Sequence, residues 1–288
     1  MIPAIESSLC SPLISYMPDF SLLHKRARHD IRICIQAWSA TLRRTLGERL
    51  GCMYALGSAV RAWDSPIDYV PVISDVDIHV YLRNKTGLLA GSEDHMRAAL
   101  DLSRLHERTF RELEPEPMHT PRSQVVVVNG LLGAEWYIPP RQRDVRPVVG
   151  ELPELREPPP ERYRFVDRWR LEQDEEFVRR LPMRTFDRTG LDLWYVIRDL
   201  TWRVSPAPAR LLTQTYPVPA DVWGWNRTRL LKELESSGYD TIASHYCAFY
   251  ERGWDLFLSD FKDTEAYRQM ILHGHTVLRE CLRHLKSL

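Results

Sequence analysis

The chain has 288 residues, of which 44 % are hydrophobic, and its 39 basic residues balance 39 acidic residues. This length predicts one large or two modest domains, with enough apolar side chains for a core. The net charge of zero argues against a protein that mainly grips nucleic acid nonspecifically, because such proteins usually carry an excess of Lys and Arg.

The cysteines and the N-terminus predict a cytoplasmic protein. The five cysteines are odd in number, scattered and never spaced C-x-x-C, a pattern typical of free thiols in a reducing compartment. The N-terminus lacks a basic start and includes Glu6, so it does not resemble a signal peptide. No apolar run approaches the ~20 residues that span a bilayer, and we therefore expect no membrane partner.

The first half of the chain is predicted to mix helices and strands. Apolar residues recur every three or four positions over residues 22–50, which predicts a long helix that ends at Gly51. A second helix is expected at 92–113, with Ser92 as its N-cap. Strands are predicted at residues 52–56, 75–82, 124–128 and 134–138.

The second half is predicted to be entirely helical. A Pro- and charge-rich stretch over residues 139–160 predicts a linker. We therefore expect a domain at 1–150, a linker at 151–160 and a second domain at 161–288. Helical periodicity in that second domain predicts helices at 161–181, 187–203, 221–236, 239–260 and 264–286. The expected fold class is α+β, with a mixed sheet followed by a helical bundle.

The strand at 75–82 carries two carboxylates, Asp75 and Asp77. Side chains at positions i and i+2 of a strand point to the same face, so these two carboxylates are directed together. A buried carboxylate pair is costly unless a cation neutralises it, and Mg²⁺ prefers oxygen ligands. The preceding strand ends in Gly57-Ser58, a small turn that lets backbone N–H groups and a hydroxyl approach a phosphate. The combination favours Mg²⁺-dependent chemistry on a nucleoside triphosphate.

This motif resembles the signature of the DNA polymerase β-type nucleotidyltransferase superfamily. The resemblance is carried by an apolar strand, Gly-Ser, a loop and Asp-apolar-Asp-apolar on the next strand, here Gly57, Ser58, Asp75, Val76, Asp77 and Ile78. The loop is a few residues longer than is usual in that family, which surface loops tolerate at small entropic cost. The order of domains is similar to that of small bacterial members of the aminoglycoside-modifying type.

The resemblance implies a nucleotidyltransferase core followed by a helical domain, with the substrate in the cleft between them. It implies transfer of a nucleoside monophosphate from an NTP to a hydroxyl acceptor, here a small molecule such as an aminoglycoside, with release of pyrophosphate. Asp75 and Asp77 would hold two Mg²⁺ ions, and Gly57 and Ser58 would bind the nucleotide. Arg61 is a further candidate for a phosphate contact. A homodimer is also consistent with the resemblance.

The third carboxylate of the family has two candidate replacements in this chain. Gln124 occupies the natural position and is a weaker metal ligand, whereas Glu135 is the nearest carboxylate, as a metal ligand or a general base. Without a third carboxylate, the alternative is a non-catalytic nucleotide-binding regulatory module. A second alternative keeps the chemistry and makes RNA or a protein the acceptor. An acidic cleft would favour a cationic drug, and a basic cleft would favour RNA.

Overall fold

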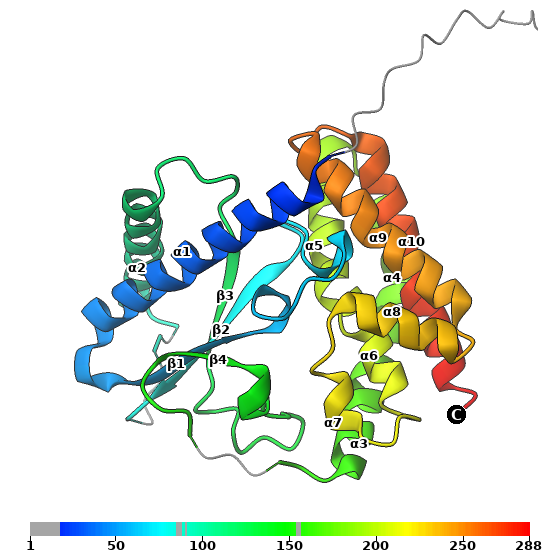
Figure 1. Cartoon of the computed structure of the whole chain (residues 1–288), viewed down its shortest axis with the longest axis horizontal. Helices are drawn as coiled ribbons and strands as arrows, with labels where there is room; N and C mark the ends of the chain where they lie inside the picture. Colours follow the sequence, from blue (N-terminus) through cyan, green and yellow to red (C-terminus); the bar gives the residue numbers. More distant parts are fainter. Residues whose placement is uncertain (1–17, 85–87, 90, 154–156) are drawn as a thin grey trace, which may run out of the picture.

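The computed structural model describes residues 18–84, 88–89, 91–153 and 157–288, and its fold class is α+β, as predicted (Figure 1). Its strands are β1 Leu50–Leu56, β2 Asp75–Leu82, β3 Arg122–Val127 and β4 Arg146–Val149. Its helices are α1 Phe20–Leu46, α2 Glu93–Leu113, α3 Pro160–Glu172, α4 Asp174–Thr185, α5 Leu193–Val204, α6 Ala207–Leu212, α7 Pro219–Val222, α8 Arg227–Ser236, α9 Asp240–Leu258 and α10 Thr264–Leu285. None of the described helices is long and apolar enough to cross a membrane.

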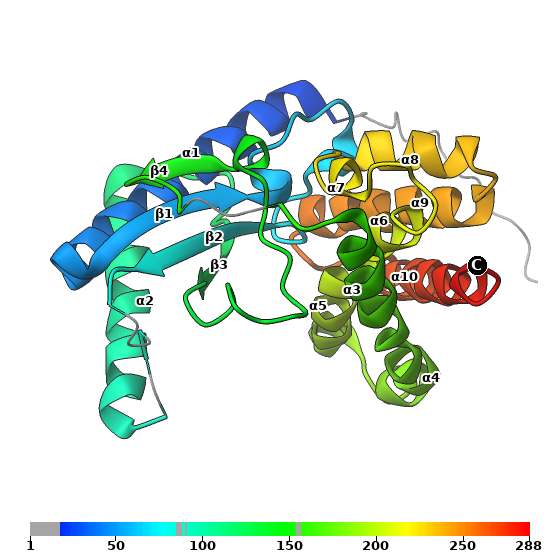
Figure 2. The same ribbon diagram turned by 90° about the horizontal axis from the view of Figure 1, so that it is seen from below.

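The strands form one mixed sheet in the order β3-β2-β1-β4. β2 is parallel to β3, and β1 is antiparallel to both β2 and β4. Along β2, the apolar residues at even-numbered positions are buried, and the residues between them are partly exposed. This period of two places one face of β2 in the core beneath α1 and leaves the other face for Asp75 and Asp77 (Figure 2).

Helix α1 lies along the buried face of the sheet. Its first turn is capped by Asp19, whose carboxylate accepts a hydrogen bond from the backbone N–H of Leu22. The helix ends at Gly47, which adopts a φ of 51°, and not at Gly51 as predicted. Gly47 has a positive φ, which glycine adopts readily, whereas Gly51 already lies within strand β1. Helix α2 begins after Ser92, as predicted.

The strand prediction at 134–138 was wrong. This segment forms a turn, in which the N–H of Tyr137 donates to the carbonyl of Ala134. Two prolines follow at once, and they lack the N–H groups that a ladder requires. The fourth strand is instead β4, which lies within the Pro-rich stretch 139–160. β4 tolerates Pro147 because it is an edge strand of the sheet.

Residues 160–285 contain the helices α3 to α10, with a core in which α10 packs against α9 and α5. The predicted helix 161–181 is two helices, because the chain turns at Gln173 between α3 and α4. The predicted helix 221–236 begins later, at Arg227, where the Asn226 side chain caps α8. Of the predicted linker 151–160, residues 154–156 lie outside the described part of the chain, as do residues 1–17.

Candidate active site

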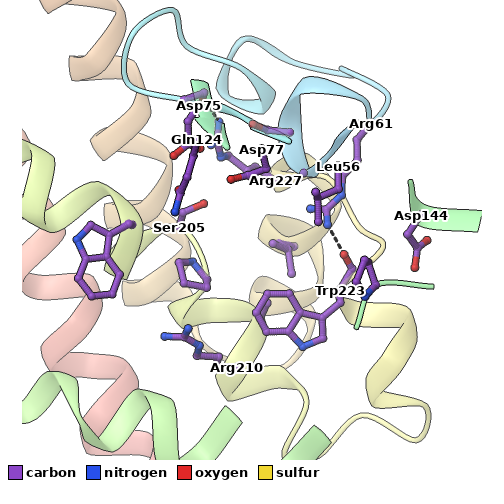
Figure 3. A pocket seen from close by; sticks show the side chains of 18 of the residues that line it. Leu56, Arg61, Asp75, Asp77, Gln124, Asp144, Ser205, Arg210, Trp223 and Arg227 are labelled. Carbon is purple, nitrogen blue, oxygen red and sulfur yellow. Dashed lines mark hydrogen bonds between the residues drawn. The ribbon is translucent and has the colours of Figure 1, made fainter. Parts of the chain in front are cut away.

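A cavity of about 990 Å³ lies between the open face of the sheet and the helices of the second half. Gly57, Ser58, Asp75 and Asp77 line it from β1, β2 and the turn after β1. Figure 3 shows Asp75 and Asp77 at one side of this cavity, with side chains from the helices across from them. The structure therefore brings together the four residues on which the sequence motif depends.

The two carboxylates have different environments. Asp75 lies 3.4 Å from the guanidinium of Arg122, on β3. Asp77 lies between Leu56 of β1 and Gln124 of β3 in the sheet register, and in the described chain it forms no ion pair. Burial, reinforced by the charge of Asp75, raises the pKa of Asp77 to about 7, although nearby arginines oppose this shift. Asp77 is thus a carboxylate that a cation would stabilise strongly.

Neither candidate for the third carboxylate position places a carboxylate beside this pair in the described part of the chain. Gln124 stands beside Asp77 on β3 and faces the cavity. Glu135 is exposed in the turn after β3 and does not line the cavity. No group of three or more metal-ligating side chains occurs in the described residues. Two carboxylates still suit Mg²⁺, because this ion commonly takes one or two carboxylates together with waters and substrate phosphates.

Gly57 is required by the close approach of its backbone to Asp77. It has a φ of 75°, which is costly for any residue with a side chain. A Cβ atom at this position would lie 2.6 Å from Oδ2 of Asp77. The glycine thereby leaves room for the carboxylate beside the first residues of the turn, where a phosphate would approach.

We expect Gly57→Ala to weaken Mg²⁺ binding as well as stability. The strained φ predicts a loss of about 1 kcal/mol in the free energy of unfolding, and the Cβ displaces Asp77. The matched control is Gly47→Ala, since Gly47 also has a positive φ but open space around it. Urea unfolding with and without Mg²⁺ and nucleotide measures both effects. Equal Mg²⁺ dependence in the two variants would contradict the steric argument.

Arg61 joins the two halves of the protein. Its guanidinium donates to the backbone carbonyls of Trp223 and Trp225, at 2.8 Å for Trp225. Its buried Nε atom has no hydrogen-bond partner in the described part of the chain. Arg61 lines the cavity, and its contact with a phosphate stays a prediction. The contacts that the structure shows connect the turn after β1 to the loop before α8 (Figure 3).

The loop between β1 and β2 is a second joint between the two halves, which the sequence did not reveal. Asp68 is buried and accepts hydrogen bonds from the backbone N–H and the hydroxyl of Thr228, at 2.8 and 2.7 Å. Arg227 donates to the carbonyls of Ile67 and Asp68 and to the hydroxyl of Ser74, which directly precedes Asp75. The extra loop residues therefore anchor the strand that carries the carboxylates.

His79 lies on the same face of β2 as the two aspartates. The hydroxyl of Tyr54 lies 3.2 Å from its Nδ1 atom, and burial lowers the pKa of His79 to about 4. A ring with this pKa is a weak base at neutral pH. Packing against Tyr54 accounts for the position of His79.

The cavity wall is rich in charge, with seven arginines and six aspartates. Sequence reasoning missed Arg122, Arg198 and Arg210 because they come from three separate elements. The acidic cluster at the end of α3 and the start of α4 does not line the cavity; its residues are Glu172, Asp174, Glu175 and Glu176. The cavity is therefore not an acidic cleft.

Comparisons with protein-family models, with curated proteins and with solved structures found no match to this chain.

Proposed function

We propose that the protein is a Mg²⁺-dependent nucleotidyltransferase that moves a nucleoside monophosphate from an NTP to a hydroxyl acceptor. The observation that carries this proposal is the Asp75–Asp77 pair, which faces a large cavity next to the Gly57-Ser58 turn. Asp77 is partly buried and has no ion-pair partner in the described chain, as expected of a metal ligand. The mixed sheet with a helical second half also agrees with the nucleotidyltransferase core that the motif implies.

The reaction is an in-line displacement at the α-phosphorus. The acceptor oxygen forms a bond to the α-phosphorus, the bond to the bridging oxygen breaks, and pyrophosphate leaves with that electron pair while the hydroxyl proton passes to water. Bound Mg²⁺ supplies charge neutralisation for the phosphates. The residues of the chain hold the phosphates and fix the reacting geometry, which is most of what such a reaction requires.

A second candidate is a nucleotide-binding regulatory module that does not transfer. The observation that favours it is the position of Gln124 beside Asp77, together with the exposure of Glu135. Both candidates bind a nucleotide with Mg²⁺. They differ in whether pyrophosphate is released when an acceptor is supplied.

The first test is thermal stabilisation by each of the four NTPs, with and without Mg²⁺. A ligand that binds the folded state raises the melting temperature, by about 2.7 kcal/mol of stability at a hundredfold excess over Kd. We expect a Mg²⁺-dependent rise that the double variant Asp75→Asn/Asp77→Asn loses. If no NTP raises the melting temperature of the wild type, both candidate functions are wrong.

A further inference from the structure

The cavity extends well beyond the carboxylate pair, into a chamber formed by the second half of the chain. We call this chamber the distal subsite and define it by Trp136, Asp167, Arg170, Arg210 and Trp223, which line one continuous cavity with Asp75 and Asp77. Figure 3 shows Arg210 and Trp223 across the cavity from the two aspartates. If the phosphates of a nucleotide bind near Gly57, the distal subsite remains open for the acceptor.

The guanidinium groups of the two arginines in the distal subsite are only partly paired among the described residues. The guanidinium of Arg170 stacks on the rings of Trp136 and Trp169, at 4.6 and 4.9 Å, and within the described residues it forms no ion pair. Arg210 reaches Asp174 only at 3.8 Å. Its buried Nε has no partner among the residues that the structure describes. A buried donor without a partner costs free energy, which a bound acceptor group would recover.

The carboxylate of the distal subsite, Asp167, is already hydrogen-bonded. Asp167 is buried and accepts a hydrogen bond of 3.0 Å from the indole Nε1 of Trp223. Burial raises the pKa of Asp167 to about 6, so this carboxylate takes up a proton more readily than an ordinary aspartate. Asp174 does not line the cavity; it lies 3.1 Å from Arg203 and 3.8 Å from Arg210, and its buried Oδ2 atom has no hydrogen-bond partner among the described residues. Within the defined distal subsite, Asp167 is therefore the one carboxylate that an ammonium group would meet, and it already accepts a hydrogen bond from Trp223.

The rest of the wall suits a flat ring. Trp136 is 41 % exposed at the edge of the subsite, and Trp223 lies opposite the aspartates. Ile138 and Pro139, which follow Trp136 in the chain, add apolar surface to the cavity wall. Rings stack on tryptophan faces, and arginine binds phosphate or carboxylate through two parallel hydrogen bonds.

We propose that the distal subsite binds the acceptor as a ring-bearing anion, with its phosphate or carboxylate on Arg170 and Arg210 and its ring on the tryptophans. This inference rests on the proposed function and narrows its acceptor, away from a polycation such as an aminoglycoside. A hydroxyl on the same molecule attacks the α-phosphorus. The bonds made and broken, and the fate of the proton, are those of the transfer described above.

The test uses three probes of one shape and different charge: phenyl phosphate, benzoate and benzylamine. Calorimetric titrations are made with the whole chain, saturated with Mg²⁺ and the non-hydrolysable methylene analogue of its preferred NTP, so that the phosphate site near Gly57 is filled. The variants are Arg170→Gln and Arg210→Gln. The control is Arg168→Gln, because Arg168 lies on the same helix α3 but pairs with Glu172 outside the cavity.

We expect one or both anions to bind the wild type at least about tenfold more tightly than benzylamine, and each distal variant to lose about tenfold in affinity. Arg168→Gln should bind as the wild type does. Tighter binding of benzylamine, or anion binding that survives in Arg170→Gln, overturns the inference even if Arg210→Gln does not fold. If NTPs do not raise the melting temperature of the wild type, the proposed function is wrong as well. If NTPs raise it but neither anion binds, only this inference is wrong.

Discussion

Asp77→Asn is expected to change the stability of the protein in opposite directions with and without Mg²⁺ and nucleotide. Without metal, desolvation and the charge of Asp75 raise the pKa of Asp77 to about 7. A carboxylate whose folded pKa is raised binds its proton more tightly in the folded state, so stability is greatest below the unfolded pKa. It falls as the pH rises toward 7, by up to about 1.4 kcal/mol per pH unit. Asparagine does not titrate, so the metal-free variant does not lose this stability as the pH rises.

With Mg²⁺ and nucleotide, the same substitution removes a ligand and its charge. We expect the wild type to gain stability from Mg²⁺-nucleotide, most strongly above about pH 7, where the metal no longer competes with a proton on Asp77. The variant should show no such gain, and its pyrophosphate release should fall by at least about 10³-fold. Chemical unfolding at several pH values, with and without Mg²⁺-nucleotide, measures both signs on the same two proteins.

The matched control is Asp101→Asn, since Asp101 is exposed on α2 and pairs only with Arg104 among the described residues. It should follow the wild type at every pH. If Asp77→Asn were less stable than the wild type at pH 8 without metal, the charge of Asp77 would not destabilise the metal-free protein, and the argument from its raised pKa would be wrong. A variant that keeps its response to Mg²⁺-nucleotide would contradict the proposed metal site.

The sequence predicted the part of the site that is local in the chain. The alternation along β2 separates the carboxylates from the buried residues, and Gly57-Ser58 follows the strand paired with it. Period and turn chemistry act over a few residues, so they can be read without a fold. The same reasoning failed at 134–138, where alternation suggested a strand and two prolines stopped the ladder.

What the sequence did not reveal depends on residues far apart in the chain. Arg227 meets Ser74 across 153 positions, and no local pattern marks the pair. Five of the seven arginines of the cavity come from β3, α3, α5, α6 and α8, so their convergence follows only from the packing of those elements. The position of Gln124, an amide and not a carboxylate, beside Asp77 likewise follows only from the register of β3.

Arg227→Met is expected to destabilise the protein by about 2 to 5 kcal/mol, because each buried acceptor that loses its donor costs about 1 to 3 kcal/mol. Arg227 is buried, and its guanidinium lies 3.9 Å from the ring centre of Tyr250. It donates to two loop carbonyls and to Ser74. Methionine fills a similar volume but leaves the two carbonyls without this donor, whereas the Ser74 hydroxyl keeps its hydrogen bond from the backbone N–H of Val70.

The control is Arg229→Met, two residues further along α8, where the arginine is exposed and stacks on Trp225. Urea unfolding should show a loss of less than about 1 kcal/mol for this control. If Arg227→Met lost equally little, the joint between α8 and the loop before β2 would not hold the two halves together. Because Ser74 directly precedes Asp75, a large loss would mean that the contact which joins the halves also fixes the start of the strand bearing both carboxylates. A substitution in α8 would then disturb the metal site without touching any metal ligand.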